Sequence, residues 1–349
     1  MRICLINNLT SDFGRGGAAV VMEEAGKKLK EEGNEVVMIS SHSCRKPEIR
    51  IWNGFKNFRL PSLYADLERL PAFLRIFWHL WDMFDLPTAR KIEQILKEEK
   101  IDFVITHNLK GLSYLTPRAI RRTGSRHEHV LHDIQLLHPS GLMFYGKEKV
   151  IESLPAKIYS RLNRALFGSP EKVLSPSGWL LKLHTDRGFF KGSEREVRPN
   201  FPSHKSDPLK RDKDRPFRFL FIGQLEKHKG VLLLIEAFKS LRGGQAELWI
   251  AGQGTLERQA EKLAGGRVEI KFLGWDAGKE TDWMRQADCL VVPSLCYENS
   301  PSVIYKAKAA GLPVIASDLG GIPELVGKGS LFRPEAAELE EKLRSRLAP

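Results

Sequence analysis

Short apolar runs alternate with helix-like stretches along most of the chain. The runs are rich in Val, Ile and Leu without polar alternation, which is typical of strands buried on both faces in a parallel sheet. The stretches between them repeat apolar residues every three or four positions, as helices packed on such a sheet do. This pattern predicts an α/β protein of βαβ units. Predicted strands cover residues 1–8, 35–40, 101–106, 130–131, 172–177, 217–223, 247–251, 268–273, 289–293 and 313–317, and predicted helices cover 18–32, 88–99, 178–187, 231–241, 280–286, 301–310 and 336–347.

A polar, proline-bearing stretch separates two such series of elements. Residues 203–216 (SHKSDPLKRDKDRP) show no hydrophobic periodicity and have the composition of a linker. A chain of 349 residues is long enough for two domains, each with its own core. We therefore predict a first domain over residues 1–200, a linker over 201–216 and a second domain over 217–349.

Residues 51–87 are the least regular part of the pattern. Aromatic residues recur there at helical spacing, which favours a helix packed into the core. The alternative is a helix that contacts a membrane or an acceptor substrate. The aromatic residues concerned are Phe73, Phe77, Trp78, Trp81 and Phe84.

The stretch 288–326 holds two predicted strands with a helix between them, and a carboxylate precedes that helix. Asn299 and Ser300 are suited to cap the helix, and Pro301 suits its first position. Glu298 then lies at the carboxyl end of a strand, where open α/β sheets bind their ligands. A helix N-terminus offers free N–H groups to an anion. A carboxylate beside such a site predicts a phosphorylated ligand that is rich in hydroxyl groups.

The first predicted strand is followed by a glycine loop, Asp12–Gly17, and then by a helix. A dinucleotide-binding fold needs the spacing G-x-G-x-x-G and an acidic residue at the end of the second strand. The loop lacks that spacing, and the second strand ends in Ser40 and Ser41. We therefore exclude an NAD-dependent enzyme. The glycines are also consistent with a tight turn that binds nothing.

The stretch 288–326 resembles the signature of the retaining glycosyltransferases of family 4, which have the GT-B fold. Several shorter segments resemble that family in the same order along the chain: Gly16-Gly17-Ala18, Thr106-His107-Asn108, Leu131-His132-Asp133, Lys229-Gly230 and Gly252-Gln253-Gly254. The matching residues of the main stretch are Pro293, Ser294, Glu298, Ala307, Ala309, Gly311, Pro313, Val314, Gly320, Gly321 and Glu324.

The resemblance implies two Rossmann-like, doubly wound domains that face each other across a cleft. The first domain would bind the acceptor and the second the donor, a nucleotide-diphosphate sugar of the UDP or GDP type. The sugar would pass to an acceptor hydroxyl with its configuration retained, without a metal and without a cofactor. Such enzymes serve polysaccharide or glycolipid biosynthesis. Relatives end in a helix that crosses back onto the first domain, and nothing after residues 336–347 resembles it.

The resemblance also assigns roles to individual residues. Lys229 would hold the donor diphosphate, Glu298 the hydroxyls of the donor sugar, and His132 would lie beside that sugar. These three residues are the predicted catalytic residues. The predicted donor-binding residues are Gly16, Gly17, Gln224, Gly252, Trp275, Asn299, Ser300, Pro301, Ser302 and Lys306, and the predicted acceptor-side residues are His107, Asn108 and Asp133.

Two positions depart from the family pattern. Lys306 stands where the family has a second Glu, whose carboxylate accepts hydrogen bonds from the ribose; a lysine only donates. Gln224 stands where the family has an Arg that binds phosphate. Two hypotheses therefore remain: an active glycosyltransferase with an altered donor site, or a related protein without turnover that binds nucleotide or acts as a partner subunit. A phosphorylase or hydrolase on the same fold is a weaker third hypothesis.

Composition and charge indicate the expected partners and cellular location of the protein. The net charge of +12 favours anionic ligands or an anionic membrane surface, and the absence of a recognisable binding motif excludes nucleic acid as a partner. The cysteines, Cys4, Cys44, Cys289 and Cys296, show no C-x-x-C spacing and are expected to be reduced thiols. The chain starts in a strand and has no long apolar run. We expect a cytoplasmic protein with peripheral contact at the inner membrane face, acting on a carbohydrate or glycolipid acceptor.

Overall fold

The computed structural model describes residues 1–11, 17–43, 46–200, 215–241 and 244–347, which form two compact units. The first unit contains Met1–Leu142 and Lys149–Arg198, and the second contains Met143–Glu148 and Pro199–Pro349. The division after Arg198 lies next to the predicted boundary, while most of the predicted linker lies outside the described residues. The short segment Met143–Glu148, which the sequence analysis included in the first domain, groups with the second unit instead.

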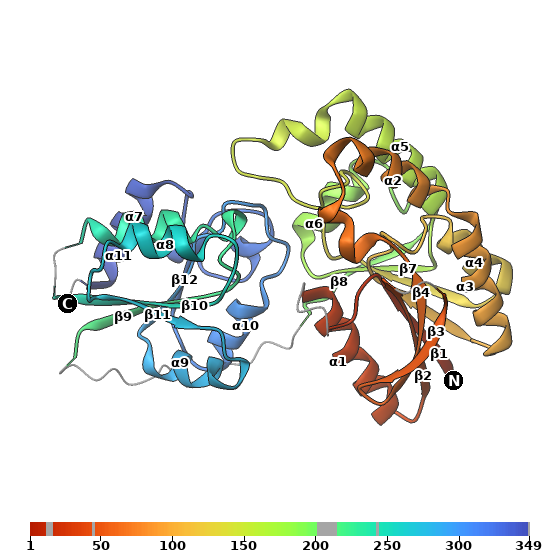
Figure 1. The fold of residues 1–349 in the computed structure, drawn as a ribbon, viewed down its shortest axis with the longest axis horizontal. Coiled ribbons are helices and arrows are strands. Elements are labelled where there is room, and N and C mark those ends of the chain that lie inside the picture. The colour runs from red at the N-terminus through yellow and green to blue at the C-terminus, as the bar shows by residue number, and fades with distance from the viewer. Residues whose placement is uncertain (12–16, 44–45, 201–214, 242–243, 348–349) are drawn as a thin grey trace. The chain divides into compact units, whose positions relative to one another are not determined.

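The first unit is built on an eight-stranded sheet with the order β3-β4-β2-β1-β5-β6-β7-β8 (red to green in Figure 1). All neighbouring strands pair in parallel except β3 and β4, which are antiparallel. The interior strands β1 and β2 are buried along nearly their whole length, as their continuous apolar runs predict. The strands are β1 (Arg2–Asn7), β2 (Glu35–His42), β3 (Glu48–Trp52), β4 (Phe55–Pro61), β5 (Phe103–Thr106), β6 (Arg126–Val130), β7 (Lys172–Ser175) and β8 (Glu194–Val197).

Three helices of the first unit, α3, α5 and α6, begin at a residue whose side chain caps the helix. Asp85 accepts a hydrogen bond from the Thr88 N–H at the start of α3, and Ser177 accepts one from the Leu180 N–H at the start of α6. The helices are α1 (Gly17–Glu31), α2 (Ala72–Met83), α3 (Leu86–Glu98), α4 (Thr116–Thr123), α5 (Leu154–Phe167) and α6 (Gly178–Thr185), and short 3₁₀ turns cover Tyr64–Arg69 and Glu148–Glu152.

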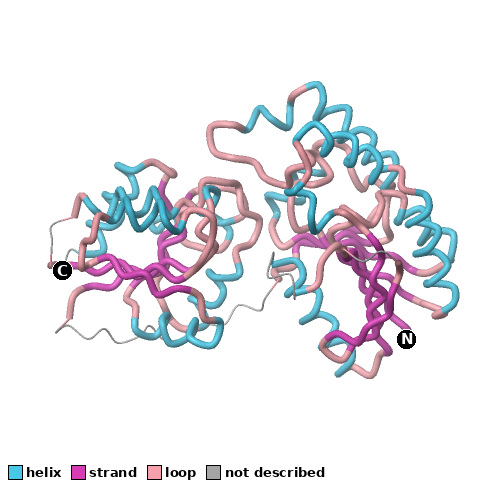
Figure 2. The backbone as a smooth tube through the Cα atoms, in the orientation of Figure 1, coloured by secondary structure: helices cyan, strands magenta, loops and turns pink. Residues whose placement is uncertain are grey.

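The second unit has a six-stranded parallel sheet with the order β11-β10-β9-β12-β13-β14 (green to blue in Figure 1; strands magenta in Figure 2). Its elements are β9 (Phe217–Ile222), α7 (Val231–Lys239), β10 (Ala246–Ala251), α8 (Glu257–Ala264), β11 (Ile270–Gly274), α9 (Glu280–Gln286), β12 (Cys289–Val292), α10 (Ser302–Ala309), β13 (Val314–Ser317), β14 (Leu331–Phe332) and α11 (Ala336–Leu347), with short 3₁₀ turns at Lys227–Lys229, Ala277–Lys279, Ile322–Glu324 and Lys328–Ser330.

The two faces of this second sheet are covered by different helices. Alternate residues of β9 point to opposite faces: Phe219 packs with α7, α8 and α11, and Leu220 packs with α9 and α10. Figure 1 shows the same division, with α7, α8 and α11 on one side of the strands and α9 and α10 on the other. The unit is therefore a doubly wound α/β layer structure, as the sequence predicts.

The predicted packing of the aromatic stripe is wrong for three of its residues. The side chains of Phe77, Trp81 and Phe84 are 67%, 65% and 50% exposed, whereas Trp78 is partly buried and stacks on Tyr64. The periodicity correctly predicts a helix, α2, but its buried side is the one that carries Asp82 and Met83. Phe73 is outside the residues whose side chains are described.

Three strands of the first unit were not predicted. β3 and β8 are edge strands with charged sequences, EIRIW and EREV, and an edge strand needs no continuous apolar run. β4 mixes polar with apolar residues. The prediction that residues 172–177 form the last strand of this domain is therefore wrong, because β8 follows β7. No helix among the described residues has the length and apolar character to cross a bilayer.

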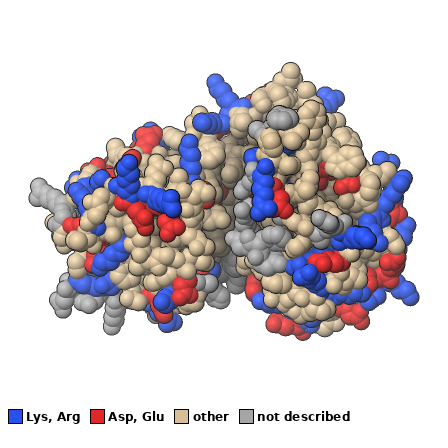
Figure 3. Space-filling model, viewed as in Figure 1, with Lys and Arg blue, Asp and Glu red and all other residues tan. Residues whose placement is uncertain are grey.

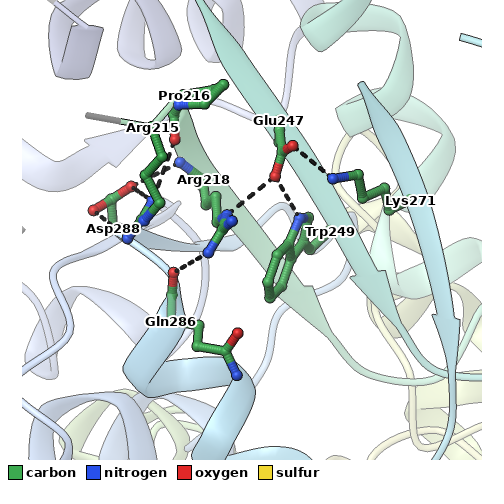
Figure 4. A network of polar contacts seen from close by, with 8 residues as sticks. All are labelled: Arg215, Pro216, Arg218, Glu247, Trp249, Lys271, Gln286 and Asp288. Atoms are coloured by element: carbon green, nitrogen blue, oxygen red, sulfur yellow. Dashed lines mark hydrogen bonds and ion pairs between the residues drawn. The ribbon is translucent and has the colours of Figure 1, made fainter. Parts of the chain in front are cut away.

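A polar network joins three strands of the second sheet on the side of α9 (Figure 4). The Glu247 carboxylate accepts hydrogen bonds from the Arg218 guanidinium at 3.0 Å, the Trp249 indole N–H at 3.0 Å and the Lys271 ammonium at 2.6 Å. Arg215, at the entry to the unit, pairs with Asp288 at 2.7 Å. The network therefore ties β9, β10 and β11 together through one carboxylate.

We expect Glu247→Gln to destabilise the second unit by about 2 kcal/mol, because two cations would lose their charge partner in a partly exposed setting. Urea unfolding followed by circular dichroism measures this. Glu257→Gln, at an exposed position on α8, is the matched control and should change stability by less than about 0.5 kcal/mol. Equal effects of the two substitutions would contradict a structural role for the network.

Candidate functional site

A partly buried ion pair lies where the second sheet presents the carboxyl ends of its strands. Glu298 follows β12, and its Oε1 lies 2.7 Å from the Lys229 Nζ. The Ser294 hydroxyl donates to the same carboxylate oxygen at 2.7 Å. The Glu298 and Lys229 side chains are 13% and 27% exposed. The pair therefore places one cation and one carboxylate side by side in a setting that is largely shielded from water.

The pair stays charged at neutral pH. Burial by itself would raise the pKa of Glu298, but the Lys229 ammonium and the hydrogen bonds from Lys229 and Ser294 outweigh it, so this pKa lies below its ordinary value. Burial would lower the pKa of Lys229, and the Glu298 carboxylate reverses this, so the pKa of Lys229 is raised. Each group thus stabilises the ionised form of the other.

Two glycines bring the backbone around this pair into close contact. Gly230 has φ +74°, and a Cβ there would lie 1.8 Å from the Pro293 carbonyl oxygen. Gly320 has φ +65°, and a Cβ there would lie 2.2 Å from the Glu298 carbonyl oxygen. Next to it, the Gly321 N–H donates to that carbonyl at 2.8 Å. Both positions therefore require glycine, and they fix the backbone that carries Lys229 and Glu298.

We expect Gly320→Ala to destabilise the second unit by about 2–4 kcal/mol and to displace Glu298, because the new methyl group would overlap a backbone oxygen. Gly327→Ala is the control, since a Cβ at Gly327 meets nothing within 4 Å. Thermal unfolding of both variants measures the difference. If the Gly320→Ala protein is as stable as the Gly327→Ala protein, the backbone at Gly320 does not lie against the Glu298 carbonyl.

The loop before Glu298 is braced by the segment Met143–Glu148. The Tyr145 N–H donates to the Leu295 carbonyl, and the Tyr297 N–H donates to the Met143 carbonyl, both at 2.9 Å. The Tyr297 hydroxyl donates to the Glu148 carboxylate at 2.8 Å. These bonds add a short antiparallel pairing outside the main sheet. The loop between β12 and α10 is therefore held by an earlier segment, Met143–Glu148, and by a later one, Gly320–Gly321.

The helix α10 starts later than predicted. Pro301 occupies the position before the first helical residue, Ser302, and is not itself the first residue of the helix. The Ser300 hydroxyl bonds the Tyr305 hydroxyl at 2.8 Å, and Asn299 is buried. Gly311, with φ +70°, ends the helical segment as predicted. The first turn of α10 therefore follows Glu298 by only a few residues. Its N–H groups are the kind of donors that bind an anion at a helix N-terminus.

Lys306, on α10, pairs away from Glu298. Its Nζ lies 2.5 Å from Oε2 of Glu280, the first residue of α9. The Lys306 side chain is 52% exposed and that of Glu280 is 13% exposed. Lys306 therefore does not serve as the cation beside Glu298, because Lys229 neutralises that carboxylate. A carboxylate nevertheless lies within reach of position 306, supplied by α9.

A second polar cluster lies in the first unit, where β5 and β6 end. The His107 Nδ1 and the His132 Nε2 are 2.7 Å apart, and the two rings stack with centroids 5.0 Å apart. The Asn108 amide donates to the Asp133 carboxylate at 3.2 Å. The same residues line a small pocket together with Tyr114 and Gln135. The four residues that were predicted separately from two strand ends are therefore neighbours.

Burial sets the protonation of this cluster. It lowers the pKa of His107 well below its ordinary value and that of His132 to about 4, so both imidazoles are neutral at pH 7. It raises the pKa of Asp133 to about 6, against the opposing effects of the Gln135 N–H, the Lys110 ammonium and the Asn108 amide. His132 therefore acts at neutral pH as a hydrogen-bonding group, not as a cation.

Comparison with known families identifies the kind of protein that carries these two clusters. Residues 15–201 match the model described as Glycosyltransferase Family 4, and residues 216–348 match the one described as Glycosyl transferases group 1. The chain belongs to the family 4 (group 1) glycosyltransferases. It is a glycosyltransferase, and its two α/β units are the Rossmann-like domains of the GT-B fold, as the resemblance implied.

Relatives and solved structures support this assignment over nearly the whole chain. An uncharacterized 42.6 kDa protein in the cps region of Klebsiella pneumoniae is 28% identical, covering 93% of this chain and 87% of the relative. A phosphatidyl-myo-inositol mannosyltransferase of Mycolicibacterium smegmatis is 27% identical, covering 95% and 80%. The structure of Anabaena Alr3699/HepE in complex with UDP and glucose has a TM-score of 0.69 at 17% identity, covering 99% and 89%. The last likeness shows the fold alone.

The other predicted site residues of the glycosyltransferase lie near the strand ends or outside the described part. Gln224 and Trp275 are exposed just after β9 and β11, and Gly252 lies against the Gly223 carbonyl. Gly17 is the first residue of α1, and Gly16 lies outside the described residues.

Sequence reasoning missed two carboxylates of the glycosyltransferase. Glu280 pairs with Lys306. Asp82, on α2, accepts hydrogen bonds from the N–H groups of Gly111 and Ser113 and is almost fully buried. The only signal in the sequence was an acidic residue inside an apolar helix for Asp82 and an uncompensated lysine for Glu280. Each signal indicates that the residue needs a polar partner, but neither signal identifies that partner.

Proposed function

We propose that this glycosyltransferase moves a sugar from a nucleotide-diphosphate sugar, of the UDP or GDP type, to a hydroxyl of a carbohydrate or glycolipid acceptor. The observation that carries the proposal is the Lys229–Glu298 pair beside the N-terminus of α10. A cation and free N–H groups suit a diphosphate, and a carboxylate suits the hydroxyls of a sugar. A nucleotide-sugar carries a diphosphate and a sugar next to each other, so it requires both kinds of group at one site.

In the proposed reaction the bond between the anomeric carbon and the diphosphate oxygen breaks while the acceptor oxygen bonds to that carbon on the same face. The acceptor proton passes to an oxygen of the departing diphosphate, so the configuration is retained. Lys229 and the first-turn N–H groups of α10 stabilise the negative charge that develops on the diphosphate, without a metal. Glu298 accepts hydrogen bonds from the sugar hydroxyls, and neutral His132 contacts the sugar.

The relatives support a nucleotide-sugar donor and a lipid-linked acceptor. Alr3699/HepE was solved with UDP and glucose, and the mycobacterial relative is named for mannosyl transfer to phosphatidyl-myo-inositol. We place the reaction in the cytoplasm at the inner membrane face, where the basic chain would meet anionic lipid.

The alternative, a protein that binds nucleotide without turnover, rests on Lys306 and Gln224. Gln224 supplies no charge for phosphate, and Lys306 supplies no acceptor for ribose. The ion pair with Glu280 weakens this alternative. Position 306 on α10 has no carboxylate of its own, but α9 supplies one 2.5 Å from the Lys306 ammonium. We therefore propose that the altered donor site remains competent.

Titration calorimetry with UDP, GDP and ADP tests the proposal. We expect the parent chain to bind one of them, and Lys306→Glu to weaken this binding about tenfold, because two carboxylates would then repel each other between α9 and α10. The charge-swapped variant Lys306→Glu/Glu280→Lys should restore most of the affinity. Lys262→Glu, an exposed change on α8, is the control.

Two outcomes would contradict the proposal. If neither the parent nor the swapped variant binds any nucleotide while both are folded by circular dichroism, the donor site is wrongly assigned. If Lys306→Glu alone binds and the parent does not, the chain as written is the non-catalytic form.

A further inference from the structure

The helix α2 presents an apolar face with no covering element among the described residues. Positions 74, 77, 81 and 84 follow one another at helical intervals of three and four, so they lie on one side of the helix. Phe77 and Trp81 are the most exposed of these side chains, at 67% and 65%. The exposed apolar side chains of this face are Leu74, Phe77, Leu80, Trp81 and Phe84.

A similar face is present on α5. Leu154, Ile158 and Leu162 lie four residues apart, and their side chains are 72%, 53% and 37% exposed. Two exposed basic residues, Lys157 and Arg161, lie between them on the same side. The sequence of α5 contains no acidic residue, and the carboxylate of Glu152, just before the helix, lies 3.5 Å from the Lys157 ammonium. The acidic residue of α2, Asp82, is buried on the opposite side of that helix.

Both helices rest on the same segment, residues 111–114. The Asp82 carboxylate on α2 accepts the N–H of Gly111 at 2.9 Å, and the Tyr159 hydroxyl on α5 lies 3.4 Å from the Tyr114 hydroxyl. Figure 1 draws both helices in the upper part of the first unit. In Figure 3 the surface over them is largely uncharged. We call the exposed apolar residues of α2 and α5, with Lys157 and Arg161, the α2–α5 surface.

We propose that the α2–α5 surface docks the glycosyltransferase on an anionic lipid bilayer, with the aromatic side chains of α2 in the interface and the basic side chains of α5 against the headgroups. The inference rests on the proposed function, because a lipid-linked acceptor would be presented at such a surface. It assigns the docking to particular residues of the first unit, which neither the fold nor the family match does.

Charge identifies lipid, and not a second copy of the chain, as the occupant. In a two-fold symmetric dimer the same patch meets itself, so Lys157 and Arg161 would face like charges. An anionic bilayer neutralises them instead, and each Lys or Arg near such a surface strengthens binding. Trp and Phe are the side chains that favour the boundary between headgroups and acyl chains. The net charge of +12 acts in the same direction.

Vesicle sedimentation of the full chain without nucleotide tests the proposal. The vesicles contain phosphatidylcholine alone or mixed with phosphatidylglycerol. We expect at least about tenfold tighter binding to the anionic vesicles. Phe77→Ser/Trp81→Ser and Lys157→Glu/Arg161→Glu should each weaken it by about tenfold or more. Val268→Ser and Lys262→Glu, an exposed apolar and an exposed basic position in the second unit, should leave it unchanged.

The depth of insertion gives a second readout. Lipids brominated on their acyl chains should quench part of the tryptophan fluorescence of the parent chain. Trp81→Phe keeps an aromatic side chain and should still bind, but that quenching should largely disappear. Quenching in Trp81→Phe as strong as in the parent chain would overturn the assignment of α2 to the interface.

Other results would also overturn the proposal. Equal binding to neutral and anionic vesicles, or unchanged binding of both double variants, would do so. A dimer in sedimentation velocity that Phe77→Ser/Trp81→Ser converts to a monomer would show that a second copy covers the surface. Nucleotide titration of the same variants separates this inference from the proposed function, because nucleotide binding should be unaffected by changes on α2 and α5.

Discussion

Replacing Glu298 by Gln is expected to lower the rate of sugar transfer by about 100- to 1000-fold, because a charge-assisted contact to the reacting sugar is lost. The amide of Gln keeps the size of the side chain and one acceptor oxygen. It cannot neutralise Lys229, whose Nζ now lies 2.7 Å from the carboxylate. Release of nucleoside diphosphate from UDP- and GDP-sugars in the presence of acceptor measures the rate.

The same substitution has a separate cost in stability. It leaves the ammonium of Lys229, which is 27% exposed, without a counter-charge, and we expect a loss of about 2–3 kcal/mol. Lys229→Met leaves the Glu298 carboxylate with the hydrogen bond from the Ser294 hydroxyl but without its ion-pair partner, and should cost a similar amount. The double variant removes both charges, so its loss should be smaller than the sum of the two single losses.

This cycle separates the two roles of the pair. If the pair is only structural, the double variant recovers both stability and activity. If the pair binds the donor, stability recovers while activity stays at the level of the worse single variant. Glu257→Gln, on the exposed side of α8, should change neither quantity. A Glu298→Gln enzyme with parental activity would remove Glu298 from the reaction.

The sequence predicts the interior of both sheets because burial on two faces leaves a local mark. The runs at β1, β9, β12 and β13 are continuous and apolar, and the structure has strands there within two residues of the predicted bounds. The position of Glu298 could be predicted for the same reason, since it lies in the loop that follows such a run. The pairing of Lys229 with Glu298 could not, because it joins residues 69 positions apart.

What the sequence could not predict depends on packing between elements. Helical periodicity predicts α2 and its apolar face, but it does not say whether another element covers that face; the exposure of Phe77 and Trp81 is a property of the assembled unit. The partner of Lys306 depends on how the start of α9 meets α10. The edge strands β3 and β8 leave little hydrophobic signal, because one side of each needs no partner.

Acidification is expected to unfold the first unit well before the second, because several of its histidines are buried as neutral rings. Burial lowers the pKa of His127 to about 3 and of His184 to about 4, and lowers those of His107 and His129 well below the ordinary value. The Thr106 hydroxyl bridges two of them, at 2.8 Å from the His127 Nε2 and 2.9 Å from the His129 Nδ1.

The direction of the effect follows from where protons bind. A histidine whose pKa is depressed in the folded state takes up a proton only on unfolding, so stability is lost as pH falls from about 6.5 towards 4. Two carboxyls act in the opposite direction: burial raises the pKa of Asp82 to about 7 and of Asp133 to about 6, so the folded state keeps their protons longer. Their contribution to stability is present in acid and lost as pH rises through those values.

These four histidines and His132 outnumber the two carboxyls by three, so unfolding near pH 5 takes up a net of about three protons at these groups, and stability falls by about 4 kcal/mol per pH unit. Urea unfolding between pH 7.5 and 4.5, followed by circular dichroism, measures this slope. His184→Phe keeps an aromatic ring beside Phe189 and Phe190 and should reduce the proton uptake by about one. His138→Asn, at a half-buried position, should change it much less. A slope that His184→Phe does not alter would mean that this ring becomes charged without loss of the fold.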